Sequence, residues 1–137
     1  MNMTKLELVR GIQLVLSDES KWCKYAPARD VQGHETRVGS IHSVSFCIYG
    51  AARKAAGLEH VGQLDFVGKE GSQMQHFWEV LADIGQYNPF KVSDGSIAHY
   101  NDRSTYAEIM QRLKEVEAKY LAEEQASRPA MATEGTA

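Results

Sequence analysis

The sequence has little cysteine, few prolines and no long run of apolar residues. Its only cysteines are Cys23 and Cys47, too few for a disulfide framework, so we expect free thiols in a reducing compartment. No apolar run approaches the length of a transmembrane helix, and no signal peptide is expected at the N-terminus. The net charge of −3, without a long basic face, argues against nucleic acid as a partner. We therefore predict a cytoplasmic protein that binds neither nucleic acid nor membrane.

What the sequence contains is typical of one globular domain. A chain of 137 residues can bury a core without disulfides or metals. Apolar residues recur at helical spacing in the stretches 4–17, 40–57, 72–85 and 105–120. Thr4 and Thr105 are each followed three residues later by glutamate, which indicates a capping box at the start of a helix. We predict a compact, mostly α-helical domain over residues 1–124 and a disordered tail over 125–137.

The stretch 40–57 is predicted to be the central buried helix of about four. Ser40 is a suitable N-cap, and Ile41, Val44 and Ile48 lie at helical spacing along one edge. This interpretation requires that edge to be buried, and the hypotheses of function below depend on it.

Gly50 lies inside this predicted helix. Glycine there costs about 1 kcal/mol relative to alanine, which suggests a close neighbour. Tight packing within the chain is one explanation, and a homodimer through the surface of residues 50–52 is another.

The segment between the first two predicted helices is irregular. Pro27 discourages helix at the residue before it, and Gly33 indicates a turn. We predict a small β-hairpin within residues 25–38.

Several short motifs occur in a characteristic order along the chain. They are Trp22, then Ala28-Arg29-Asp30 with Gly33, then Cys47 with Gly50-Ala51, then Tyr100-Asn101-Asp102. In this order they resemble a family of small bacterial and phage proteins that is known only as a domain of unknown function. Tyr100 stands where the pattern has tryptophan. The resemblance implies a compact, mostly helical domain and brings no activity with it, while the occurrence in phages suggests phage–host contact as one role.

Cys47 is the first candidate for chemistry. A nucleophilic cysteine needs a depressed pKa, supplied by a helix N-terminus or a neighbouring histidine. Cys47 is predicted to lie in mid-helix, where core packing is the simpler interpretation. A catalytic role would require His99 as base and Asp102 as orienting acid, brought over the central helix by the fold.

Two polar pairs form the second candidate site. Arg29-Asp30 and Asn101-Asp102 can hold their own loops by hydrogen bonds. Alternatively, Arg29 can bind a carboxylate or phosphate through two hydrogen bonds, while Asp30, Asn101 and Asp102 hydrogen-bond to the rest of a small ligand.

The histidines and cysteines show no metal-ligand spacing such as Cys-x-x-Cys or His-x-x-x-His. We therefore expect no metal site and no cofactor.

The leading hypothesis is a small, soluble, non-catalytic binding or interaction protein of bacterial or phage origin, with phage–host contact as one role. Its partner is a protein or a small ligand. The alternative is a small-ligand-binding protein or a cysteine-dependent enzyme, whose pocket would contain Arg29, Asp30, Cys47, His99, Asn101 and Asp102.

Overall fold

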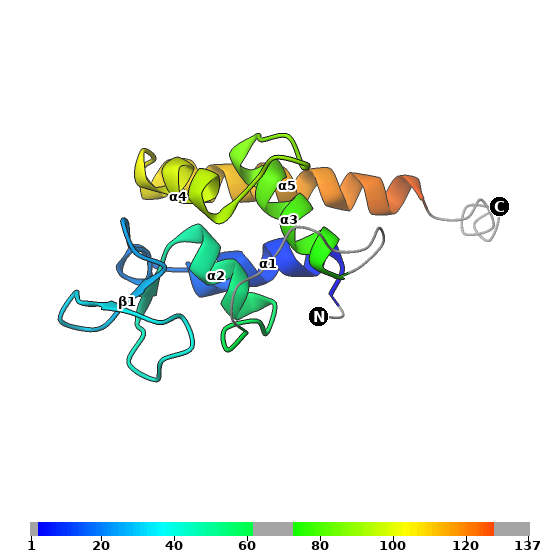
Figure 1. Cartoon of the computed structure of the whole chain (residues 1–137). Helices are drawn as coiled ribbons and strands as arrows, with labels where there is room; N and C mark the ends of the chain where they lie inside the picture. The colour runs from blue at the N-terminus through cyan, green and yellow to red at the C-terminus, as the bar shows by residue number, and fades with distance from the viewer. Residues whose placement is uncertain (1–2, 62–72, 128–137) are drawn as a thin grey trace.

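The computed structural model describes residues 3–61 and 73–127, which are mostly helical (Figure 1). Its α-helices are α1 (Lys5–Val15), α2 (Ile48–Ala55), α3 (Gln73–Gly85), α4 (Asp94–Asp102) and α5 (Tyr106–Ala126). A 3-10 turn, η1, covers Glu19–Lys21. Three short strands are β1 (Ala28–Arg29), β2 (Glu35–Thr36) and β3 (Ser45–Phe46). The prediction of a mostly α fold with a small hairpin is therefore confirmed.

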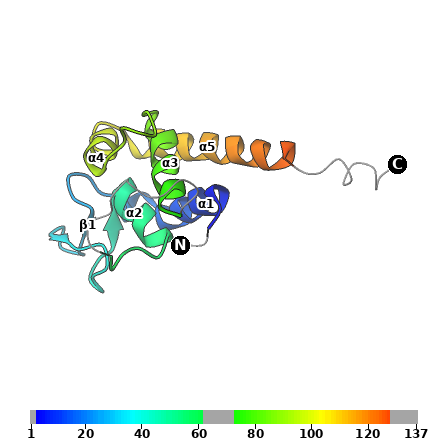
Figure 2. The ribbon, with the colours of Figure 1, turned by 45° about the vertical axis from the view of Figure 1, so that its right-hand side comes forward.

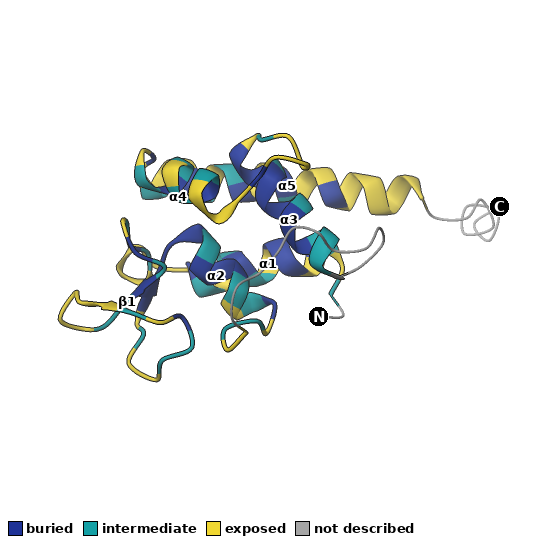
Figure 3. Ribbon diagram, viewed as in Figure 1, coloured by how far each residue is buried: buried dark blue, intermediate teal, exposed yellow. Residues whose placement is uncertain are grey.

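The helices form two layers joined by α3. In Figures 1 and 2, α4 and α5 lie in one layer, α1 and α2 lie in the other, and α3 runs between them. The small sheet lies beside the start of α2, and the last turns of α5 extend beyond the other helices. Those last turns are exposed, whereas the facing surfaces of the layers are buried (Figure 3).

The core lies between the layers and follows the apolar stripes of the helices. Fully buried side chains from four helices meet there: Leu8, Ile12, Ile48, Phe77, Leu81, Ile109 and Leu113. The predicted capping boxes are present at both ends of the chain, since the side chain of Thr4 accepts from the amide of Glu7, and that of Thr105 from the amide of Glu108. These caps satisfy amides that the first helical turn leaves unpaired.

The predicted helix over 40–57 is wrong in its first half. Helix α2 begins only at Ile48, so Ser40 caps no helix. Ile41 is 93% exposed and Val44 is 47% exposed, while Ile48 is fully buried. The predicted buried edge therefore holds at one of its three positions, so it lends the functional hypotheses no support, and they have to be argued from the contacts of the site itself.

Strand pairing explains this difference. The amide of Val44 donates to the carbonyl of Arg29 at 2.9 Å, and β3 pairs antiparallel with β1. These bonds to a distant segment give the backbone at 44–46 partners that a helix would otherwise supply. The helix can start only after the strand ends, so Cys47 becomes the N-cap of α2.

The predicted hairpin is present. Strands β1 and β2 pair antiparallel, with Ala28 opposite Thr36, and Gly33 turns the chain between them with φ +84°. Strand β3 adds to the other side of β1, which gives the order β2-β1-β3. This third strand was not predicted, because its residues had been assigned to the central helix.

Two further helix boundaries differ from the prediction. Helix α4 is not among the predicted helical stretches; Ser93 is its N-cap, and its side chain accepts from the amide of Ser96. Helix α5 runs to Ala126, so it includes the first two residues of the predicted tail, 125–137. Residue 72, where the third predicted helical stretch begins, and residues 128–137 of the predicted tail lie outside the described residues.

The small residues of α2 are buried inside the chain. Ala51 and Ala52 are fully buried, and a side chain at Gly50 would overlap the carbonyl oxygen of Pro27. The close neighbour expected at Gly50 is therefore a backbone of the same chain. The proposed homodimer surface over residues 50–52 lies within the fold.

Candidate functional site

Asn101 joins three separate parts of the fold. It is buried in α4, where its Oδ1 accepts hydrogen bonds from Trp22 Nε1 at 2.7 Å and from the amide of Ile48 at 3.0 Å. Its Nδ2 donates to the carbonyl of Cys23 at 3.0 Å and to Asp102 Oδ1 at 3.1 Å. The hydrogen-bonding capacity of the amide is thus filled by protein groups. Asn101 therefore holds these segments together and has no hydrogen-bonding capacity left for a ligand.

Asp102 holds the loop that precedes β1. Its Oδ1 accepts from the amide of Tyr25 at 2.9 Å. Tyr25 has φ +65°, a left-handed conformation that is uncommon for an aromatic residue, and its side chain is 73% exposed. The other carboxylate oxygen, Oδ2, receives no hydrogen bond from the described part of the chain. That oxygen is available to a ligand.

A cavity of about 400 Å³ lies beside this carboxylate; we name it the Asp102 cavity. Its wall comes from three segments: Tyr25, Ala26 and Pro27 of the loop, Cys47 and Tyr49 at the start of α2, and Asp94, Gly95, Ala98 and Asp102 of α4. Two of the predicted site residues, Cys47 and Asp102, are therefore brought together. The loop is held against α4 by the bonds of Asn101 and Asp102, which fixes the shape of the cavity.

Arg29 and Asp30 do not line the Asp102 cavity. The Arg29 guanidinium donates to the carbonyls of Lys24 and Gly33, both at 2.9 Å. Asp30 Oδ1 accepts from the amides of Gln32 and His34, each at 2.9 Å, and these backbone bonds lower the pKa of its carboxyl. Both side chains hold the hairpin, so their structural interpretation is the better supported one.

His99 is exposed on α4 and is absent from the wall of the Asp102 cavity. In the described structure, Asp102 lines the wall of the cavity beside Cys47, whereas His99, the proposed base, does not. The arrangement lacks the geometry that a cysteine–histidine nucleophile needs.

Cys47 itself is unsuited to nucleophilic attack. As the N-cap of α2 it lies at the helix end that favours a thiolate, contrary to the predicted mid-helix position. Its Sγ accepts from the amide of Gly50 at 3.4 Å, which also favours the thiolate. Burial outweighs both effects and raises the pKa of Cys47 to about 12. The wall of the Asp102 cavity therefore carries a neutral thiol at neutral pH.

This state of Cys47 predicts the outcome of thiol labelling. In the folded protein at pH 7.5, iodoacetamide should leave Cys47 unmodified over an hour, because the thiolate fraction is on the order of 10⁻⁵ to 10⁻⁴ and the side chain is buried. In urea the same residue should be alkylated fully. Mass spectrometry of tryptic peptides measures both, and the exposed thiol of added glutathione serves as the internal control. Complete labelling of folded protein would restore the cysteine-dependent hypothesis.

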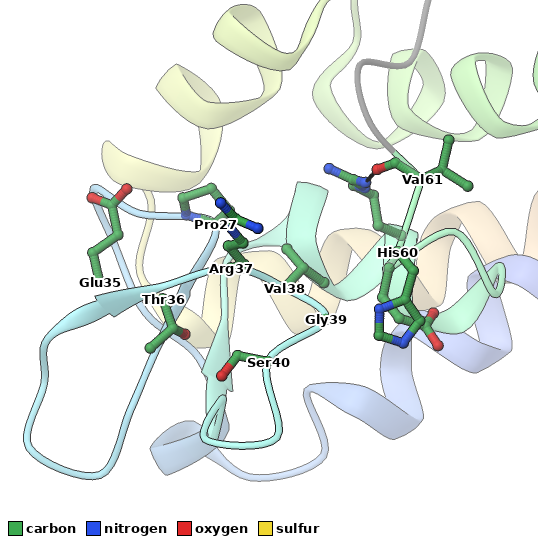
Figure 4. Close-up of a pocket in the computed structure, with 11 residues that line it drawn as sticks. Pro27, Glu35, Thr36, Arg37, Val38, Gly39, Ser40, His60 and Val61 are labelled. Atoms are coloured by element: carbon green, nitrogen blue, oxygen red, sulfur yellow. Dashed lines mark hydrogen bonds between the residues drawn. The ribbon is translucent and has the colours of Figure 1, made fainter.

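A second, larger cavity of about 970 Å³ lies beside β2 and the end of α2. Figure 4 shows the Arg37 side chain reaching over Pro27, with His60 on the opposite side. The guanidinium of Arg53, which also lines it, donates to the carbonyls of Leu58 and Val61. None of the predicted site residues lines this cavity, whereas two of them line the Asp102 cavity.

Sequence reasoning missed most of the wall of the Asp102 cavity. Asp94, Ala98 and Asp102 follow a four-residue spacing that places them on one helix face. Recognising Ser93 as a helix cap would have revealed that face. The contributions of Tyr25 and Tyr49 had no comparable signal, because they depend on how the loop and α2 pack on α4.

Among residues 3–61 and 73–127, no group of three or more histidine, cysteine or acidic side chains is placed to hold a metal ion. None of the helices in these ranges has the length and apolar character needed to cross a membrane.

Comparison with known proteins matches the chain to a family model. The model of a family described as a family of unknown function, DUF6197, matches residues 1–119. No curated protein and no solved structure matches the chain. The predicted resemblance to a family of unknown function is thereby confirmed, and the bacterial or phage origin stays a prediction.

Proposed function

We propose that this chain, which belongs to DUF6197, a family of unknown function whose model matches residues 1–119, is a non-catalytic protein that binds a small ligand in the Asp102 cavity. The family brings no activity with it, so the proposal is argued from the geometry of the cavity. The observation that carries this proposal is that Cys47 and Asp102, far apart in sequence, line one cavity. This choice keeps the ligand-binding class of the alternative hypothesis in preference to the interaction protein, but with a different pocket, since only Cys47 and Asp102 of the six predicted pocket residues line the cavity.

The Asp102 cavity has the features of a small-molecule site. Its volume of about 400 Å³ lies within the usual range for ligand pockets, which combine apolar walls with a few polar groups. Ala26, Pro27 and Ala98 supply apolar wall, and Asp102 Oδ2 supplies an acceptor that no residue in 3–61 or 73–127 uses. The Asn101 network fixes the loop before any ligand arrives, which lowers the ordering cost of binding.

Binding without catalysis fits the chemistry of the wall better than an enzyme does. The thiol of Cys47 is neutral, and His99 is exposed outside the cavity. Phage–host contact and cytoplasmic location stay predictions, because no described contact favours them over other roles.

Filling the Asp102 cavity is expected to abolish binding. Ala98 is half-buried in the wall, so Ala98→Phe should occupy the cavity while its backbone stays helical. A library of fragments, neutral and charged, would be screened against ¹⁵N-labelled protein by NMR. Fragments that shift the amides of Tyr25 and Tyr49 in the natural protein should bind at least about tenfold more weakly to the variant.

Ala118→Phe, at an exposed position of α5, is the matched control and should leave binding unchanged. Circular dichroism would show that both variants are folded. If no fragment shifts the amides around the Asp102 cavity, or if Ala98→Phe binds the fragments as tightly as the natural protein, the proposed function is wrong.

A further inference from the structure

We propose that Cys23 and Cys47 are a redox-sensitive pair, which joins as a disulfide when a small disulfide oxidant is present. Both are buried free thiols in this structure. Their pairing follows from contacts between the two chain segments that carry them, and it is independent of the proposed function.

The two cysteines occupy neighbouring positions on adjacent segments of the backbone. Trp22 forms a parallel bridge with Phe46, and the amide of Cys23 donates to the carbonyl of Phe46 at 3.0 Å. Cys23 and Cys47 are the residues that follow these two bridge partners, so they face each other in register. Adjacent strands lie about 4.8 Å apart, and the Cα atoms of a disulfide are about 4.4–6.8 Å apart. The backbone therefore gives the two cysteines the spacing that a disulfide needs.

Asn101 ties the same two segments together on the other side of the cysteines. Its Nδ2 donates to the carbonyl of Cys23, and its Oδ1 accepts from the amide of Ile48. In a regular parallel pair these two backbone groups would bond to each other directly, so the side-chain amide takes the place of one ladder bond. The cysteines thus lie between a direct bond and a bridged one, and they cannot move apart without breaking a buried hydrogen bond.

The two thiols lie on the same face of these segments. Residues two apart in a strand point to the same face, so Cys47 shares its face with Ser45. Burial raises the pKa of Cys23, and a hydrogen bond with the Ser45 side chain opposes that rise, so Cys23 points to this face as well. Burial is also the main cause of the raised pKa of Cys47, and the nearby Cys23 adds to it.

Oxidation of the pair needs an electron acceptor, and a small disulfide such as oxidised glutathione can supply it. The Cys23 sulfur attacks one glutathione sulfur and loses its proton, and the first glutathione leaves as a thiol. The Cys47 sulfur then attacks Cys23 Sγ, loses its own proton and releases the second glutathione. Two electrons and two protons pass from the protein to glutathione. Because burial keeps both thiols neutral, we expect this exchange to be slow, and its equilibrium is the quantity to measure.

The disulfide would fasten the segment before β1 to the N-terminus of α2. Such a bond restricts the unfolded chain, so the oxidised protein should have a Tm roughly 10 °C above that of the reduced protein. Cys47 is part of the wall of the Asp102 cavity, where oxidation would replace a thiol by a disulfide.

The redox equilibrium tests whether the fold favours the bond. Reduced protein and protein oxidised in urea would be held in glutathione buffers at pH 8, with and without urea, until both give the same disulfide fraction by mass spectrometry. We expect the equilibrium constant for disulfide formation to be about 100-fold larger in the folded than in the unfolded protein. Peptide mapping without reductant should find Cys23 joined to Cys47 within one chain. A constant no larger in the folded protein, or a bond between two chains, would overturn the proposal.

Cys23→Ala and Cys47→Ala are the matched controls. Each variant can take up one glutathione but cannot form the internal bond, so neither should show the rise in Tm in the oxidising buffer. A rise of similar size in either variant would show that a single cysteine or the buffer causes it, which would contradict the pairing. Should a variant fail to fold, the two equilibrium constants of the natural protein decide alone.

Discussion

Asn101→Leu is expected to lower the free energy of unfolding by about 4 kcal/mol. Leucine has a similar volume but cannot make the four hydrogen bonds of Asn101. It would leave the amide of Ile48, the indole of Trp22 and the carbonyl of Cys23 without partners, and each unpaired buried group costs about 1–3 kcal/mol. Trp22 is only half-buried, so water can replace part of its bond. Urea unfolding followed by circular dichroism measures the change.

A loss of this size should lower Tm by roughly 15 °C for a domain of this length. The control is Gln125→Leu, which replaces an exposed amide side chain on α5 and should change stability by less than about 0.5 kcal/mol. Unfolding of Asn101→Leu at the same urea concentration as the natural protein would show that Asn101 does not join the loop, α2 and α4 as described.

Gly50→Ala is expected to destabilise the protein by about 3 kcal/mol, opposite in sign to the usual effect. In a helix interior alanine is favoured over glycine by about 1 kcal/mol. Here the added methyl group would overlap the carbonyl oxygen of Pro27 and lie 3.0 Å from its carbonyl carbon. That carbonyl also accepts from the amide of Cys47 at 3.2 Å, so α2 cannot move away without losing this bond. Overpacking against a fixed neighbour costs about 1–3 kcal/mol or more.

Gly95→Ala is the matched control for Gly50→Ala. Gly95 also lies in a helix, but the nearest atom to its added methyl group is Ser93 Oγ at 3.7 Å, an ordinary contact. The control should be neutral or stabilising by up to about 1 kcal/mol. Both would be measured by urea unfolding. A stabilising effect at both positions would contradict the close approach of α2 to Pro27.

The helices at the two ends of the chain could be predicted because their signals are local. Thr4 and Thr105 satisfy amides only three residues away, and the buried stripe of α5 that contains Ile109 and Leu113 recurs at steps of three or four residues. The failure over 40–47 has the opposite origin. Its apolar spacing is compatible with a helix, yet Val44 bonds to Arg29 and the strand that follows pairs with β1.

The candidate site was predictable only in part for the same reason. Asp102 and Cys47 could be selected by residue type, and both line one cavity. Arg29 was also selected by residue type, but its guanidinium already donates hydrogen bonds to two backbone carbonyls. Residue type shows what a side chain can bond to, and only packing shows which of those bonds are already made.

The sequence by itself determined the helical class, the caps of the first and last helices and the β1–β2 turn, because each depends on residues a few positions apart. The tertiary structure decided where α2 begins, that Cys47 is a buried neutral thiol and that Asp102 faces a cavity. Those features depend on contacts between distant segments, such as the bond from the amide of Ile48 to Asn101, 53 residues away. Local spacing carries no information about such contacts.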